Sequence, residues 1–165
     1  MVSGEWRVAQ DPAILYHSLF AIRLKGRCLT MDDLARYFWI MFGGALGTGF
    51  RFWCSGVVAR AFGETFPWGT LLINVFGSLV IGFFATITGP EGRIFAGATT
   101  RQFVMIGLCG GYTTFSSFSL QTLNLMQDGE WVGAAGNIVG SVVLCLLAVW
   151  VGHVLAVYLN APKWT

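Results

Sequence analysis

Four long apolar segments, separated by short polar connectors, dominate the hydrophobic pattern of this chain. They run from about Tyr37 to Ala59, from Gly69 to Thr88, from Phe103 to Met126 and from Trp131 to Leu159. Each approaches or exceeds the roughly 20 residues that an α-helix needs to cross the hydrocarbon core of a bilayer. The pattern therefore predicts an all-α integral membrane protein with four transmembrane helices.

The ends of these segments carry helix-ending and interfacial residues. The connectors contain Gly63, Pro67, Pro90 and Gly129, and the carboxylates Asp32 and Asp33 stand where the first helix should begin. Four tryptophans lie near the predicted ends, where amphipathic rings favour the membrane interface: Trp39, Trp68, Trp131 and Trp164.

Composition agrees with a membrane location. Hydrophobic residues make up 55% of the 165 residues and charged residues only 11%, whereas a soluble domain carries about 25% charged residues. The mean hydropathy is +0.67. A net charge of +2 is too small to indicate a nucleic-acid partner. The four cysteines show no CxxC or Cys/His spacing, so they are interpreted as small apolar residues rather than zinc ligands.

The first thirty residues do not follow this pattern. Met1 to Thr30 contains four basic residues and a short apolar patch, Ala13 to Ile22, that is too short to span a bilayer. We expect residues 1–30 to be a disordered extension or to precede the true start at Met31, with residues 31–165 as the transmembrane domain. An amphipathic surface anchor is the alternative interpretation.

The third segment is interrupted by a glycine- and hydroxyl-rich stretch. Gly107 to Ser119 contains three glycines, two threonines, three serines and two phenylalanines, and no charged residue. Irregular backbone in hydrocarbon is tolerated only where it is buried in protein or lines a polar cavity. The stretch therefore predicts a helix broken at mid-membrane, which is typical of an intramembrane site for an ion or a small polar solute.

Two polar residues in the other segments allow two interpretations each. The amide of Asn74 either lines that site or makes an interhelical hydrogen bond. Arg51 either extends to the interface or lines an aqueous vestibule that attracts anions. Asn137 and Ser141 lie four residues apart in the last segment, share a helix face and could extend a polar track.

The segments contain no Asp or Glu, since Glu64, Glu91, Asp128 and Glu130 fall in connectors. Proton-coupled transporters usually use an intramembrane carboxylate or histidine, and cation pathways use acidic rings or carbonyl filters. Amide, hydroxyl and aromatic-edge donors together with one arginine favour an anion instead.

The interrupted stretch itself offers chemistry for two ions. Phe115 and Phe118 share a helix face, and their positive ring edges could solvate a dehydrated anion, although such pairs more often reflect simple packing. Nearby hydroxyls supply hydrogen-bond donors. Carbonyls without helical partners, from Gly110 to Thr113, are suited to a cation such as Na⁺.

Small residues also recur at the spacing that lets membrane helices approach closely. Three glycine pairs have members four residues apart: Gly43 and Gly47, Gly107 and Gly111, Gly136 and Gly140. The chain contains 22 glycines, so chance spacing explains any single pair nearly as well.

At these residues the chain resembles the Fluc (CrcB-type) fluoride channels. The resemblance covers nearly all of Met31 to Leu159. It rests on Gly43-Gly-Ala-Leu-Gly-Thr-Gly-Phe-Arg51, on Pro67-Trp-Gly-Thr-Leu-Leu-Ile-Asn74 and on the highly specific Gly107-Leu-Cys-Gly-Gly-Tyr-Thr-Thr-Phe-Ser-Ser-Phe-Ser119. It implies an antiparallel, dual-topology homodimer with two separate fluoride pores and a structural Na⁺ at the dimer interface.

The resemblance also implies roles for individual residues. The backbone carbonyls of Gly110 and Thr113 would hold the Na⁺. The implied fluoride pore consists of Asn74, Phe115, Phe118, Thr114, Ser116, Ser117, Ser119 and the vestibule residue Arg51. Members commonly carry a glutamate where this chain has Gln121.

We therefore expect a passive fluoride channel, not an enzyme, in the inner (plasma) membrane that exports F⁻ from the cytoplasm and reduces its toxicity. Its expected partners are fluoride, membrane lipid and a second copy of the chain, with no nucleic acid. The alternatives are a small four-helix proton-coupled multidrug antiporter, which would need a membrane carboxylate, and a non-transporting membrane scaffold.

Overall fold

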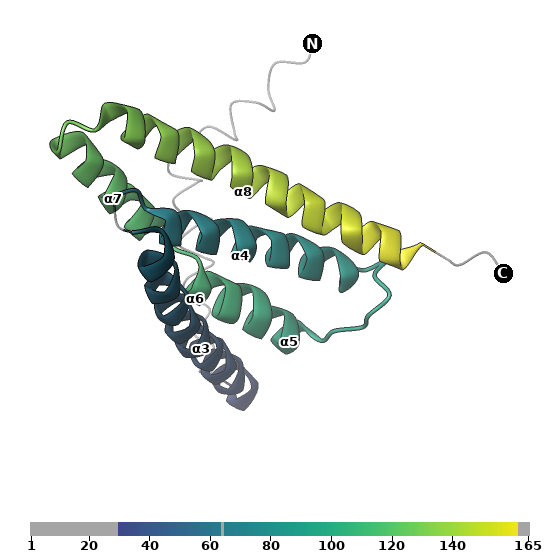
Figure 1. The fold of residues 1–165 in the computed structure, drawn as a ribbon. Coiled ribbons are helices and arrows are strands. Elements are labelled where there is room, and N and C mark those ends of the chain that lie inside the picture. The colour runs from purple at the N-terminus through teal and green to yellow at the C-terminus, as the bar shows by residue number, and fades with distance from the viewer. Residues whose placement is uncertain (1–29, 64, 162–165) are drawn as a thin grey trace, which may run out of the picture. The chain divides into compact units, whose positions relative to one another are not determined.

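A computed structural model describes residues 30–63 and 65–161, and every regular element within these ranges is a helix (Figure 1). The chain divides into two units, Met1–Leu34 and Ala35–Thr165. The helices are α3 (Met31–Phe62), α4 (Trp68–Ile87), α5 (Ala98–Gln102), the π-helix η1 (Phe103–Cys109), α6 (Gly110–Tyr112), α7 (Phe115–Gln127) and α8 (Trp131–Asn160). The predicted all-α class is confirmed for the described residues.

Three stretches of the described chain are long and apolar enough to cross a membrane: α4, the combined stretch Ala98–Gln127, and α8. Both α4 and α8 begin and end within one residue of the predicted segments. The first predicted segment also forms a helix, α3, of 32 residues. It is not among the three, because it is less apolar on average than α4 or α8: glycines and Arg51 lie within its apolar stretch, and its other charged residues lie near its ends.

The start of α3 lies where the two carboxylates predicted it. Within the short described part of Met1–Leu34, Thr30 and Asp33 cap the helix reciprocally. The backbone N–H of Asp33 donates to Thr30 Oγ1 (3.2 Å) and the backbone N–H of Thr30 donates to Asp33 Oδ2 (3.2 Å). This is a capping box, which pairs two N–H groups that a helix start otherwise leaves unbonded. Residues 1–29, to which the expected extension belongs, lie outside the described residues.

Helix α4 packs extensively against α8, and the two lie side by side (Figure 1). Glycine makes the approach close on both helices. A Cβ on Gly82 would lie 2.3 Å from the Val149 carbonyl oxygen, and one on Gly152 would lie 2.2 Å from the Leu79 carbonyl oxygen. Close contacts of this kind drive membrane helices together. Lipid tails are as apolar as the side chains, so the hydrophobic effect does not favour helix association in the bilayer. The predicted glycine pairs did not include these two residues.

Two of the three predicted glycine pairs pack against each other. A Cβ on Gly47 would lie 2.2 Å from the Leu108 carbonyl oxygen, and one on Gly111 would lie 2.5 Å from the Gly44 carbonyl oxygen. The pair Gly43 and Gly47 therefore contacts the stretch that carries Gly107 and Gly111. The third pair differs, since a Cβ on Gly136 or Gly140 would meet nothing within 4 Å in the described structure.

Gly152→Ala is expected to destabilise the protein, because the added methyl group would overlap the Leu79 carbonyl and the Phe83 N–H of α4. Overpacking of this kind costs about 1–3 kcal/mol. Gly133→Ala on the same helix is the matched control, because a Cβ there would come no closer than 3.6 Å to a neighbouring atom. It should be neutral or slightly stabilising, since alanine favours helix by about 1 kcal/mol. Thermal unfolding in detergent compares the two. Equal midpoints would contradict the close packing of α4 and α8.

Candidate functional site

The irregular backbone in the third segment is limited to two threonines. Thr113 has φ −83° and ψ 157°, and Thr114 has φ −152° and ψ 110°, so both are extended between α6 and α7. The predicted irregular stretch was too long: Gly107 lies in η1, and residues 110–112, which we expected to be interrupted, form α6. Gly107 and Gly111 instead serve helix packing against α3. The π-helical turn of η1 was not predicted, and π-helical turns are frequent at functional sites.

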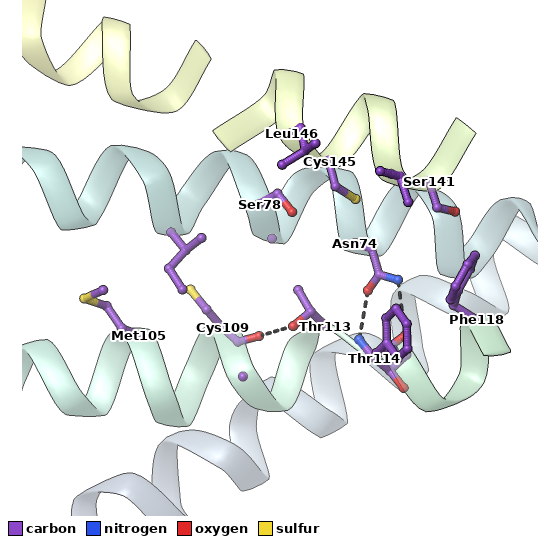
Figure 2. Close-up of a pocket in the computed structure, with 15 residues that line it drawn as sticks. Asn74, Ser78, Met105, Cys109, Thr113, Thr114, Phe118, Ser141, Cys145 and Leu146 are labelled. Atoms are coloured by element: carbon purple, nitrogen blue, oxygen red, sulfur yellow. Dashed lines mark hydrogen bonds between the residues drawn. The ribbon is translucent and has the colours of Figure 1, made fainter. Parts of the chain in front are cut away.

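Asn74 of α4 binds the extended backbone directly. Thr114 N–H donates to Asn74 Oδ1 (2.8 Å), and Asn74 Nδ2 donates to the Thr114 carbonyl (3.2 Å). Figure 2 shows both bonds as dashed lines between the two residues. The amide thereby pairs the Thr114 N–H, which the interruption leaves without a helical partner, and also donates to the Thr114 carbonyl. Of the two interpretations of Asn74, the structure shows the interhelical hydrogen bond, and one Nδ2 hydrogen stays available for a ligand.

The hydroxyl of Thr114 caps the start of α7. It accepts a hydrogen bond from the Ser117 N–H (3.2 Å) as an N-cap and lies 3.0 Å from Ser117 Oγ and 3.2 Å from Ser116 Oγ. Threonine is a favoured N-cap because its oxygen pairs an N–H of the first turn. Ser119 donates instead to the Phe115 carbonyl (2.9 Å). Thr114, Ser116 and Ser117 thus form a local network around the start of α7.

These bonds redirect two N–H groups away from the carbonyls of Gly110 and Thr113. In a continuous helix the Thr114 N–H would bind the Gly110 carbonyl and the Ser117 N–H would bind the Thr113 carbonyl. Here the first donates to Asn74 and the second to Thr114 Oγ1. Hard oxygen donors of this type suit Na⁺. In the described part of the chain, His, Cys, Asp and Glu form no cluster of three or more that could hold a metal.

The two phenylalanines lie at one cavity of about 420 Å³, which we call the phenylalanine cavity. Their ring centroids are 5.2 Å apart and the planes are tilted by 48°. Phe118 is only 9% exposed, whereas Phe115 is 76% exposed within the described chain. The cavity is also lined by Asn74, Ser78, Cys109, Gly110, Thr113, Thr114, Ser141 and Cys145, most of them labelled in Figure 2.

Arg51 lies at a second cavity, the arginine cavity, of about 230 Å³. Its Nε is buried and has no hydrogen-bond partner in the described structure, and the same holds for Gln121 Oε1 on the opposite helix α7. Other polar residues that line this cavity are Thr48, Ser55, Thr70, Thr114 and Ser117. A larger pocket of about 720 Å³ shares Ser55, Thr70 and Gln121 with it.

Thr114 lines both cavities, so both adjoin the interruption of the helix. The structure brings Asn74, Thr114, Phe115 and Phe118 together at the first cavity and places Arg51 and Ser117 at the second. Ser116 and Ser119 line neither of these two cavities. Sequence reasoning did not assign Ser78 to the site, although it stands one helical turn after Asn74 and so shares its face.

Three further lining residues, Cys109, Ser141 and Cys145, were also left out of the predicted site. Ser141 belongs to the polar track that the sequence predicts in the last segment, together with Asn137. In the sequence, the two cysteines look like ordinary apolar residues of a membrane helix. They are recognised as cavity residues only in the folded structure, where η1 and α8 both line one cavity.

Comparison with known proteins identifies the family to which the chain belongs. The chain is 64% identical over 130 residues to the fluoride-specific ion channel FluC of Opitutus terrae, covering 79% of this chain and 98% of that protein. It is 65% identical over 127 residues to FluC of Methylocella silvestris (77% and 97% covered) and 60% identical over 124 residues to FluC of Rhodospirillum rubrum (75% and 96% covered). The sequence profile of the CrcB-like proteins (camphor resistance, CrcB) matches residues 38–153. The chain therefore belongs to the CrcB-like protein family.

Proposed function

We propose that this protein is a fluoride-selective ion channel that lets F⁻ leave the cell across the inner (plasma) membrane. Relatives that share 60–65% of the aligned residues carry the name fluoride-specific ion channel. The observation that carries the proposal is that an arginine-lined cavity and a phenylalanine-lined cavity both adjoin Thr114.

The chemistry of the two cavities suits an anion. Within residues 30–63 and 65–161, no protein group accepts a hydrogen bond from the buried Nε–H of Arg51, and a guanidinium is always charged. Among the described residues that line the two cavities there is no Asp or Glu, so none of these residues places a carboxylate beside the arginine or in the path of an anion. Phenylalanine edges carry partial positive charge and would replace water around a small, strongly hydrated ion. The pathway would lead from Arg51 past Thr114 to Phe115 and Phe118.

The driving force would be the membrane potential alone. With the inside negative, outward movement of one negative charge gains about 2.3 kcal/mol per 100 mV. A pathway of this type needs no chemical step, which agrees with membership of a channel family rather than an enzyme family.

We also propose that two copies assemble in antiparallel orientation, with α3 as a fourth crossing and the helix interruption near mid-membrane. Much of α8 is apolar and exposed in the single chain, including Val139, Val143 and Leu146. Gly136 and Gly140 on the same helix have no neighbour there. Lipid or a second copy would cover this surface, and small residues favour a helix partner.

The carbonyls of Gly110 and Thr113 fit the Na⁺ that the proposed dimer would hold at its interface. Both lack their helical donors because the Thr114 and Ser117 N–H groups bind elsewhere. When bound, Na⁺ would neutralise the partial negative charge of these carbonyl oxygens. Its role here would be structural.

Purified full-length protein in liposomes loaded with potassium fluoride tests the function. After valinomycin is added in sodium-containing buffer, we expect rapid fluoride efflux at a fluoride electrode and no chloride efflux from matched liposomes. Efflux that required a pH gradient would favour an antiporter. No efflux from folded, dimeric protein would favour a scaffold and contradict the channel.

A further inference from the structure

The largest fully buried side chain in the described structure is a polar one, Asn137 of α8, which is 1% exposed. It does not line the phenylalanine cavity. An amide with no partner in such surroundings would cost several kcal/mol, and Asn137 is not left in that state. Its hydrogen bonds connect two helices that form walls of the cavity.

The bonds form a chain with a defined direction. Ser141 Oγ donates to Asn137 Oδ1 (3.4 Å), Asn137 Nδ2 donates to Thr122 Oγ1 (2.8 Å), and Thr122 Oγ1 donates to the Phe118 carbonyl (2.8 Å). Thr122 and Ser141 are buried as well. Both ends of the chain, Phe118 on α7 and Ser141 on α8, line the phenylalanine cavity.

Asn137 therefore stands behind the cavity and is bonded toward two of its walls. The bond from Asn137 to Thr122 is a side-chain bond between α7 and α8, and it acts on the helical turn that carries Phe118. A buried bond of this kind is directional, whereas apolar packing would let α7 turn or slide against α8. The contacts between α7 and α8 are far fewer than those between α4 and α8, so α7 depends more on such a link.

We propose that Asn137 is a positioning residue for conduction, which holds the Phe118 ring in place at the cavity through Thr122. The inference rests on the proposed fluoride channel and adds to it a residue that no ion touches. Without the link, the ring loses its fixed place relative to Asn74 and Thr114, and an ion loses the aligned set of donors. Preorganised donors are what stabilise an ion in a narrow passage.

Three variants test the proposal in the liposome efflux assay. Thr122→Val removes the hydroxyl while nearly keeping the side-chain shape, Asn137→Leu removes the amide, and the double variant removes both. We expect each single variant to slow fluoride efflux at least about tenfold. The double variant should be no more than about twofold slower than the slower single variant, because both changes break one link.

Two controls separate positioning from general stability. Thr122→Ser keeps the hydroxyl and should restore efflux to within about twofold of the unmodified channel. Ser141→Ala removes the other end of the chain and leaves the bond from Asn137 to Thr122 intact. If it reproduces the loss that Asn137→Leu causes while Thr122→Val conducts normally, Asn137 acts through Ser141 and the link to Phe118 is refuted. Oligomeric state and thermal midpoint are measured for every variant, and efflux is expressed per folded channel.

Thr122→Val decides the outcome, since it is the variant closest in shape to the original. Folded Thr122→Val protein that conducts within about twofold of the unmodified channel would overturn the proposal. Failure of Asn137→Leu to fold does not alter this decision. Absence of efflux from the unmodified protein refutes the proposed function instead, so the two failures are distinguishable.

Discussion

Phe118→Ile and Phe115→Ile are each expected to abolish fluoride efflux while leaving the protein folded. Both rings line the phenylalanine cavity in mutual contact, and isoleucine is apolar but has no positive ring edge to replace water around the ion. A loss of about 3 kcal/mol of ion stabilisation slows passage about a hundredfold. Electrode-recorded efflux from liposomes measures the effect.

The two rings differ in burial, which makes the comparison informative. Phe118 is buried against its own chain and Phe115 is exposed, so only Phe118→Ile should also lower the thermal midpoint. Phe95→Ile is the matched control, because Phe95 is exposed in a connector and lines neither cavity. Normal conduction by both cavity variants would show that the two phenylalanines do not contribute to the ion pathway.

Asn74→Leu is expected to cause the second large loss, in both conduction and stability. It removes the acceptor of the Thr114 N–H and the donor to the Thr114 carbonyl. The Thr114 N–H would lose its partner, and a buried polar group left unpaired costs about 1–3 kcal/mol. The extended threonines would then shift, and the lining that Thr114 gives to both cavities would shift with them. Thermal unfolding and fluoride efflux together measure the two losses.

Gln127→Leu provides the comparison for Asn74→Leu, since it also exchanges an amide for leucine but at an exposed position on α7. It should conduct normally and unfold at the same temperature. If Asn74→Leu keeps its stability and loses only conduction, the amide serves the ion and not the backbone. If it keeps both, the two bonds do not hold Thr114 in place.

Much of the fold follows from local sequence properties. Apolar length predicted α4 and α8 to within one residue, and the carboxylates predicted the start of α3. The motif around Gly107–Ser119 led to the family that the comparisons show. The first segment was harder to interpret: α3 is less apolar than α4 and α8 and is not recognised as a membrane span by apolarity, although the helix itself forms as predicted.

The place of the interruption was decided by the tertiary structure. Glycines suggested irregular backbone from Gly107 onward, yet helix continues to Tyr112, and α3 packs closely against those glycines. The two extended residues are those that Asn74, 40 residues away in the chain, binds. Spacing along one helix could not reveal this, because the bond exists only when α4 docks beside the third segment.

The same distinction applies to the cavities and to helix packing. Sequence by itself determined the membrane class, the helices and the polar residues placed within them, since hydropathy and periodicity are properties of neighbouring residues. Only the tertiary structure decided that Gly82 and Gly152, not Gly136 and Gly140, pack tightly in the single chain. It likewise decided that Asn137 bonds to Thr122 and that two cavities adjoin Thr114. Contacts between distant residues depend on how helices dock, and no local pattern encodes that geometry.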